Sequence, residues 1–224
     1  MINTLPTHVY LTWTVAVLYT LVLFYIADNK KVRVIGFFIL WGILHSILAI
    51  AGFYDNTMSM PPRVALLMLP MFVIILAAIF YKPFQDWMAS LDLKYLTWLH
   101  VVRIPVELTL FWLFCYKFVP EIMTFEGRNF DILAGLTAPL AVWLGFRVGS
   151  LNKTVLWIWN IFSILLLTNI MITAVLSIPT VFQQFGFEQP NVAVYHFPFI
   201  LLPGIVVPLV LTANIAAFII LRRS

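Results

Sequence analysis

Long, continuous apolar runs separated by short polar segments extend along the whole chain. A helix needs about 20 predominantly apolar residues to cross the hydrocarbon core of a bilayer. Within the runs, apolar and polar residues do not alternate one by one, which excludes the strands of an outer-membrane barrel. Seven runs reach or approach the spanning length: Val9–Ile26, Val34–Phe53, Val64–Phe80, Leu96–Phe118, Phe130–Val148, Val155–Ile178 and Tyr195–Leu221.

The composition supports the same interpretation. Of the 224 residues, 63% are hydrophobic and only 10% are charged, and the mean hydropathy is +1.02. Soluble domains typically carry about 25% charged residues, because water must solvate their surface. We therefore expect an all-α integral membrane bundle of about seven transmembrane helices. No segment is long enough for a separate soluble domain, so residues 1–224 are predicted to form a single transmembrane domain.

The distribution of basic residues predicts the orientation of the bundle. Cytoplasmic loops carry an excess of Lys and Arg. With the N-terminus outside and the C-terminus in the cytoplasm, nine basic residues fall in inner segments and three in outer ones. The inner nine are Lys30, Lys31, Arg33, Lys82, Lys94, Arg147, Lys153, Arg222 and Arg223; the outer three are Arg63, Lys117 and Arg128. Without the third run, which is short and contains Pro70, this bias would be lost, so the charges favour keeping that run as a span.

Two inner segments have predictable local structure. Tyr81–Tyr95 mixes apolar and charged residues and is predicted to form an interfacial amphipathic helix. Residues 149–153 are too few for more than a turn. The chain has no basic run that would indicate nucleic-acid binding, and its single cysteine, Cys115, cannot form an intramolecular disulfide or a cysteine-based metal site.

The fourth run contains three ionisable residues in its apolar sequence: His100, Arg103 and Glu107. Their spacing of three and four residues places them on one helical face, and Arg103 and Glu107 are expected to pair directly. An ionised group at the centre of a spanning helix costs roughly 2.5–3.5 kcal/mol on insertion scales. This face must therefore point into the bundle, either as a structural ion pair or as a binding or proton-handling site.

Other polar residues in the apolar runs are candidates to complete such a site. Histidine is the strongest of them because it titrates near neutral pH. Prolines in the fourth and last runs break the backbone hydrogen-bond ladder and free carbonyl groups there. The candidates are His45, Asn160, Asn169, His196 and Asn214, and the prolines are Pro105, Pro198, Pro203 and Pro208.

Two outer segments, residues 120–131 and 179–195, are richer in acidic and aromatic residues than plain connectors. They are expected either to be re-entrant loops held at the interface by Phe side chains, or to form a gate or binding surface. Their charged candidates are Glu121, Glu126, Arg128, Asp131 and Glu188.

The stretch Met123–Ile132, together with Gln189-Pro190-Asn191 and the later Phe197-Pro198-Phe199, resembles a family of uncharacterised bacterial multi-span membrane proteins. The resemblance covers roughly the C-terminal half of the chain. It implies a location in the bacterial inner membrane and brings no known activity.

Three functions fit the sequence, and no cofactor follows from it. The preferred one is a small carrier or proton-coupled binding protein, with Arg103 holding an anionic or lipid ligand and Glu107 or a histidine taking a proton. The second is a membrane-embedded enzyme or cofactor protein that uses His45, His100 and His196. The third is a non-catalytic partner or sensor in which the charges of the fourth run are structural.

Overall fold

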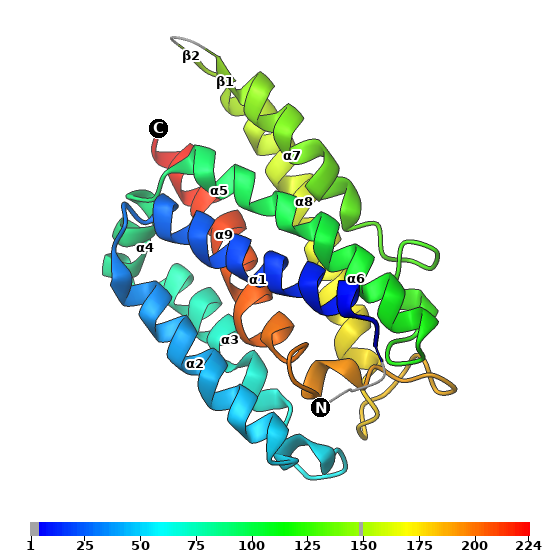
Figure 1. The fold of residues 1–224 in the computed structure, drawn as a ribbon. Coiled ribbons are helices and arrows are strands. Elements are labelled where there is room, and N and C mark those ends of the chain that lie inside the picture. Colours follow the sequence, from blue (N-terminus) through cyan, green and yellow to red (C-terminus); the bar gives the residue numbers. More distant parts are fainter. Residues whose placement is uncertain (1–4, 148–149) are drawn as a thin grey trace.

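The computed structural model describes residues 5–147 and 150–224, and its architecture is a helical bundle (Figure 1). Five of the predicted runs correspond to single helices whose ends differ from the sequence estimate by a few residues. The run Leu96–Phe118 is divided between two helices, and the α-helix in the run that starts at Tyr195 begins only at Val207. The helices are α1 (Thr7–Ala27), α2 (Val32–Ile50), α3 (Ala65–Phe80), α4 (Lys82–Ala89), α5 (Leu93–Leu99), α6 (Arg103–Cys115), α7 (Ile132–Gly145), α8 (Lys153–Leu176) and α9 (Val207–Arg223).

Five helical segments are long and apolar enough to cross a bilayer: α1, α2, the segment from α5 through α6, α8, and the segment ending in α9. A sixth is obtained if α3 and α4, which meet at an angle of 97°, are taken as one broken span. The helix α7 has only 14 residues, shorter than the predicted run from Phe130, because Asn129 and Asp131 turn inward before it begins. All-helical architecture is thus confirmed, with five or six candidate spans among the described residues.

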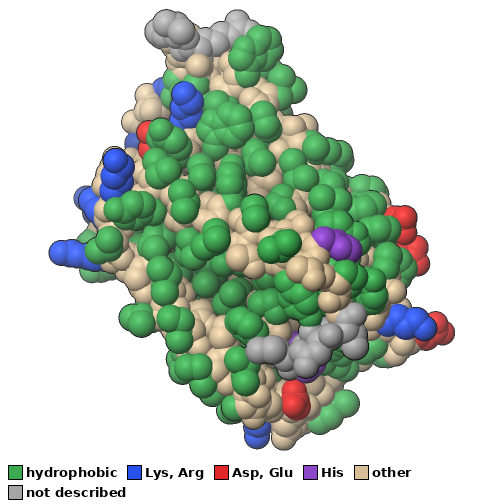
Figure 2. Space-filling view, viewed as in Figure 1, with side chains coloured by type: hydrophobic (Ala, Val, Ile, Leu, Met, Phe, Trp, Pro, Cys, Tyr) green, Lys and Arg blue, Asp and Glu red, His purple; other side chains and the backbone are tan. Residues whose placement is uncertain are grey.

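The last helix occupies the centre of the bundle. Of the most apolar 18-residue window of the segment ending in α9, 72% is buried, against 22–50% for the other candidate spans. In Figure 1, α9 lies behind α1 and between α3 and α8. The outer helices instead expose large apolar side chains such as Leu40 and Trp143. Figure 2 shows apolar side chains over much of this face of the bundle. An apolar exterior around an apolar centre is the arrangement expected when lipid, rather than water, covers the helices.

The two ends of the bundle differ in charge. The helix α1 begins at the end opposite to the one where α9 finishes (Figure 1). Most Lys and Arg side chains in Figure 2 gather toward the end that carries the α1–α2 turn, while acidic side chains gather at the other. Of the predicted amphipathic segment Tyr81–Tyr95, residues Lys82–Ala89 form α4, and the residues from Leu93 onward belong to α5. At the same end, β1 (Phe146–Arg147) and β2 (Ser150–Leu151) pair in an antiparallel hairpin; of the predicted turn at 149–153, residue 149 lies outside the described residues.

Proline positions account for two breaks in the spans. A 3-10 turn, His100–Val102, separates α5 from α6, one turn before Pro105, whose ring excludes an α-helical bond to Val101. A π-helical segment, Leu202–Val206, precedes α9 and contains Pro203. Both breaks were expected from the sequence, and both lie beside the site described below.

The close packing of α7 against the start of α6 depends on Gly135. A Cβ there would lie 2.8 Å from Ile104 Cγ1 and 3.1 Å from the Ile104 backbone nitrogen, whereas a Cβ at Gly36 in α2 would meet nothing within 4 Å. We expect Gly135→Val to destabilise the fold by about 1–3 kcal/mol, because the added methyl groups overpack a tight contact. The measurement is the temperature at which half of the chromatographic monomer peak of the detergent-solubilised protein is lost. Gly36→Val is the matched control, and equal shifts in the two variants would contradict the prediction.

Candidate functional site

Arg103 is the first residue of α6, and only 2% of it is exposed. Its Nη1 atom donates to Asp131 Oδ1 at 2.6 Å and to the carbonyl oxygen of Ser163 in α8 at 3.0 Å. Asp131 immediately precedes α7, so one guanidinium nitrogen ties together three helices. A charge-assisted bond of this kind is stronger than a neutral one, and burial of both partners keeps water from competing.

Asn129 connects this ion pair to the second buried acid of the fourth run. Its Nδ2 atom lies 2.7 and 2.6 Å from the two carboxylate oxygens of Glu107 and also donates to the carbonyl oxygen of Met123. Its Oδ1 atom accepts from the backbone N–H of Asp131 at 3.0 Å. Glu107, Asn129, Asp131 and Arg103 therefore form one continuous buried polar network, which we call the Arg103 network.

The predicted direct pair between Arg103 and Glu107 is wrong. Among the described residues, the ion pair of Arg103 is with Asp131, and Glu107 accepts from Asn129 instead. A helical spacing of four residues permits a pair but does not enforce one. Here the loop before α7 supplies a closer carboxylate and an amide, and each satisfies one member of the expected pair.

Two donors of Arg103 are not matched by protein acceptors. Within the part of the chain that the structure describes, Nε and Nη2 are buried and have no hydrogen-bond partner. A buried donor without a partner costs about 1–3 kcal/mol, and more when it is charged. The same residue lines a cavity of about 410 Å³, together with Glu107 and Asp131.

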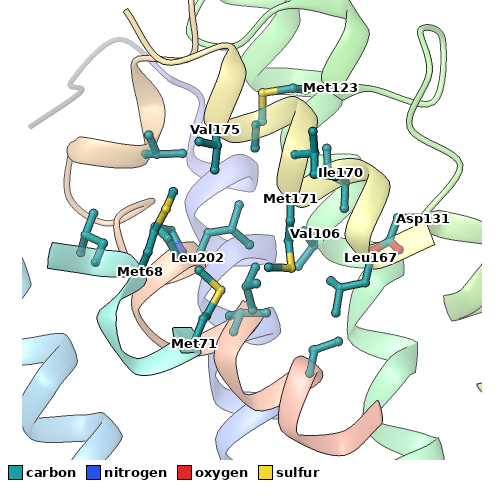
Figure 3. A pocket seen from close by; sticks show the side chains of 18 of the residues that line it. Met68, Met71, Val106, Met123, Asp131, Leu167, Ile170, Met171, Val175 and Leu202 are labelled. Atoms are coloured by element: carbon teal, nitrogen blue, oxygen red, sulfur yellow. The ribbon is translucent and has the colours of Figure 1, made fainter. Parts of the chain in front are cut away.

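The cavity lies between α3 and α8, with the π-helical segment and the start of α9 along one side (Figure 3). Its walls are almost entirely apolar, and they include four methionines whose flexible side chains adapt to differently shaped ligands. Phe72 and Ile172, which are 59% and 54% exposed, lie at its outer edge, so the cavity reaches the apolar surface of the bundle. The methionines are Met68, Met71, Met123 and Met171.

The second outer segment closes the cavity at one end. Gln189 Nε2 donates to the carbonyl oxygens of Phe114 and Val119, where α6 has just ended. Asn191 and Val194 then reach the cavity wall, and Asn191 Oδ1 is buried without a partner among the described residues. The outer segments are thus packed parts of the site rather than free connectors.

His100 lies close to Arg103 but faces a different space. It forms an edge-on ring contact with Trp159 at 5.1 Å, and its Nδ1 atom is 3.5 Å from Ser163 Oγ. With Asn160 it lines a void of about 10 Å³, roughly the space for one water molecule. Asn160 Nδ2 donates to the carbonyl oxygen of Asn214 at 3.0 Å. These three candidates therefore form a polar cluster of their own, outside the wall of the larger cavity.

His45 and His196 line neither the Arg103 cavity nor the void beside His100. His45 Nδ1 is hydrogen-bonded to the hydroxyl group of Tyr54, and its ring lies 4.2 Å from that of Trp41. Burial raises the pKa of Tyr54 to about 12, so this hydroxyl stays protonated and can donate to His45. His196 packs beside Tyr195. The described residues contain no group of three or more His, Cys, Asp or Glu side chains placed to hold a metal ion.

Asp131 was predicted as a charged residue of the outer loop that could form a gate or binding surface. It is instead only 4% exposed and belongs to the Arg103 network. The other charged loop candidates, Glu121, Glu126, Arg128 and Glu188, are exposed. Sequence reasoning did not identify the roles of Asn129, Ser163 and Asn191. The position of Asn129, two residues before Asp131 in the same loop, was a usable signal, whereas a serine carbonyl in an apolar helix gives none. Asn169, the remaining sixth-run candidate, donates to the carbonyl oxygen of Arg128.

The fold and the cavity define a helical bundle compatible with a membrane protein that encloses a charged network beside an apolar space. The model of a family described as a domain of unknown function, DUF8737, matches residues 61–222, which is 162 of the 224 residues. The chain belongs to this family. The match includes every residue that lines the Arg103 cavity and leaves out α1 and α2. Neither the curated proteins nor the solved structures contain a match to the chain.

Removing one partner of the buried ion pair should cost far more than removing both. Asp131→Leu leaves the guanidinium buried and uncompensated, which typically costs 3–5 kcal/mol, whereas Arg103→Met/Asp131→Leu removes both charges and can be close to neutral. Unfolding of the purified protein in mixed micelles gives the free energies. The exposed pair of Arg223 and Asp86 is the control: Asp86→Leu should change stability by no more than about 1 kcal/mol. A double variant as unstable as Asp131→Leu would contradict this expectation.

Proposed function

We propose that this chain is an integral membrane protein that binds an amphiphilic ligand, with an anionic head and an apolar body, in the cavity between α3 and α8. The observation that carries the proposal is the buried guanidinium of Arg103, whose Nε and Nη2 atoms have no partner among the described residues, at the wall of a 410 Å³ cavity. A carboxylate or phosphate oxygen matches these donors in geometry. The two carboxylates that also line the cavity, Glu107 and Asp131, are already engaged by Asn129 and Arg103.

The chemistry of the walls narrows the class of ligand. Ligand cavities in proteins commonly measure about 300–1,000 Å³, so this one suits a small molecule or a single hydrocarbon chain. Apolar cavities exclude water and favour apolar occupants. A strongly polar substrate such as a sugar would lose its hydration here without compensation, whereas a fatty-acid-like molecule would bury its chain and present its head to Arg103.

The site's relation to the surface supports entry from within the bilayer. The exposed residues at the outer edge of the cavity, Phe72 and Ile172, belong to the apolar exterior of the bundle. A molecule dissolved in lipid can therefore reach the cavity between α3 and α8 without passing through water.

A carrier role is the second candidate, and one observation favours it over a static binding site. The π-helical segment Leu202–Val206 contributes Leu202, Pro203 and Val206 to the cavity wall. Irregular turns of this kind are frequent at functional sites, and they are places where a helix changes its bend at low cost. The enzyme alternative has less support, because none of His45, His100 and His196 lines the Arg103 cavity.

The membrane arrangement is part of the proposal. We propose seven crossings in the inner membrane, with α3 and α7 as short spans, the N-terminus outside and the C-terminus in the cytoplasm. The gathering of basic side chains at one end of the bundle supports this orientation. Short spans are tolerated because a bilayer thins locally or the flanking side chains extend to reach the interface.

Ligand binding is tested with dodecanoate and with dodecanol, which shares the chain but has a neutral head. We expect the protein in zwitterionic nanodiscs to bind dodecanoate at least about tenfold more tightly than dodecanol. A charge-assisted hydrogen bond in a site without water contributes more than the roughly 1.4 kcal/mol that corresponds to a tenfold change in affinity. The preference should disappear in Arg103→Met/Asp131→Leu. The measurement is equilibrium binding of the radiolabelled compounds.

A variant that fills the cavity tests whether the two compounds bind there. The larger side chain of Met171→Trp fills the cavity and should abolish binding of both compounds. Leu165 lies on the same helix and is 63% exposed, so Leu165→Trp should leave binding of both compounds unchanged. If wild-type protein binds the two compounds equally, or if Met171→Trp binds like Leu165→Trp, the proposed site is wrong.

Orientation is tested by cysteine labelling in a Cys115→Ser background. A membrane-impermeant maleimide added to sealed spheroplasts should label Glu188→Cys, which lies in an outer segment, and should not label Ser90→Cys, at the opposite end. After the membrane is opened, both should react. The reverse pattern in sealed spheroplasts would overturn the orientation.

A further inference from the structure

A second hollow lies on the other side of α3 from the Arg103 cavity, and we call it the inner groove. It measures about 1090 Å³ and lies between α2 and α3, with Phe84 and Trp87 of α4 at one end. Among the described residues, no residue lines both hollows. The Arg103 network plays no part in the inner groove, so it needs a separate explanation.

The charges of the inner groove are confined to one end. Lys30, Lys31 and Arg33 lie at the turn between α1 and α2, and all three are exposed. From Val34 onward, the wall formed by α2 is apolar and aromatic and ends at Trp41. The facing wall from α3 is apolar throughout and consists of Leu69, Pro70, Val73 and Ile74. The groove is therefore cationic at its head and apolar along its length.

The length of the groove matches one leaflet of a bilayer. Nine residues separate Val32, where α2 begins, from Trp41, which corresponds to about 14 Å along a helix at 1.5 Å per residue. The hydrocarbon core of a bilayer is about 30 Å thick, so the apolar wall extends over about half of it. A molecule with an anionic head at the membrane surface and chains that end near the midplane fits this pattern.

The cationic turn is held in place by hydrogen bonds. Trp87 Nε1 donates to Asp28 Oδ1 at 3.0 Å, Asn29 Nδ2 donates to the carbonyl oxygen of Ser90, and the backbone N–H of Asp92 donates to the carbonyl oxygen of Ala27. Asn29 and Lys30 have φ angles of 52° and 62°, a left-handed turn that makes the chain reverse sharply. The three cations therefore project from a fixed turn, and little order has to be gained when an anion binds.

The first turn of α2 adds to the attraction for an anion. Lys31 precedes it, no side chain caps it, and its first turn has no acidic residue. Amide N–H groups at a helix N-terminus favour phosphate oxygens. Asp28 is the opposing charge in the groove, but it is 1% exposed, is engaged by Trp87 and lies beside Lys31. Three cations and free helix amides thus outweigh one buried acid.

We propose that the inner groove is a binding site for an anionic phospholipid, whose phosphate-bearing head lies on Lys30, Lys31 and Arg33 and whose acyl chains lie between α2 and α3. Two properties of the groove identify this occupant: the cations at one end complement an anionic head, and the apolar wall is as long as one leaflet of the bilayer. A neutral zwitterionic lipid would fit the apolar wall equally well but would gain less at the cations.

Quenching of tryptophan fluorescence by brominated acyl chains tests the proposal, because Trp41 and Trp87 both line the groove. The full chain is reconstituted in vesicles that mix brominated phosphatidylglycerol with ordinary phosphatidylcholine, and then with the labels exchanged. We expect the anionic lipid to be preferred at the groove by about fivefold or more, because one cation near an anionic surface already contributes roughly that factor. Trp41→Phe should remove a share of the quenching.

Two triple variants separate the site from the general charge of this end. Lys30→Gln/Lys31→Gln/Arg33→Gln should abolish the preference. Lys82→Gln/Lys94→Gln/Arg222→Gln removes the same charge from exposed residues at the same end that do not line the groove, and it should keep the preference. No preference in the wild-type protein, or equal loss in both triple variants, would overturn the proposal.

A variant that retains every cation covers the case in which the first triple variant fails to fold. Val73→Phe narrows the apolar part of the groove and should reduce quenching by brominated chains at least twofold. Val15 of α1 is 60% exposed and does not line the groove, so Val15→Phe is the control and should leave the quenching unchanged. Unchanged quenching in Val73→Phe would count against an acyl chain in the groove. The lipid preference is measured without dodecanoate, so a failure of dodecanoate to bind the Arg103 cavity would overturn the proposed function and leave this test intact.

Discussion

A guanidinium enclosed by apolar helices must find acceptors within reach of its own side chain, because neither lipid nor an apolar neighbour can replace water around it. Arg103 meets this demand with Asp131 from the loop before α7 and with a backbone carbonyl of α8. The starts of α6 and α7 and the middle of α8 are thereby fixed relative to one another, and Asn129 extends the constraint to Glu107. Much of the geometry of the site follows from the need to pair this one charge.

The same constraint explains why the segments 120–131 and 179–195 pack against the bundle. A loop that supplies Asn129 and Asp131 to a buried network cannot move freely without exposing charges to an apolar surrounding. Gln189, from the segment 179–195, donates to the carbonyl oxygens of Phe114, in the last turn of α6, and of Val119. Polar residues that resemble surface decoration in the sequence thus have structural partners that lie far away along the chain.

The sequence predicted the helices well, because each is encoded by a local apolar run and its ends by nearby polar residues. The end of α2 differs by three residues from the run that predicts it, and the proline breaks before α6 and α9 occur where Pro105 and Pro203 require them. The site was predicted less well, because its partners are set by contacts between helices. Arg103 and Asp131 are 28 residues apart, and Arg103 and Ser163 are 60 apart. Helical spacing favoured Glu107 as the partner of Arg103, since it considers only one helix at a time.

The helix α3 is the common wall of two spaces. Its residues Leu67, Met71 and Ile75 line the Arg103 cavity, while Pro70 and Val73, on the opposite face, line the inner groove. A displacement of this single helix that widens one space must narrow the other. Any molecule that is sensitive to the position of α3 on one side therefore changes the free energy of occupancy on the other, and thermodynamic reciprocity makes the two effects equal in size.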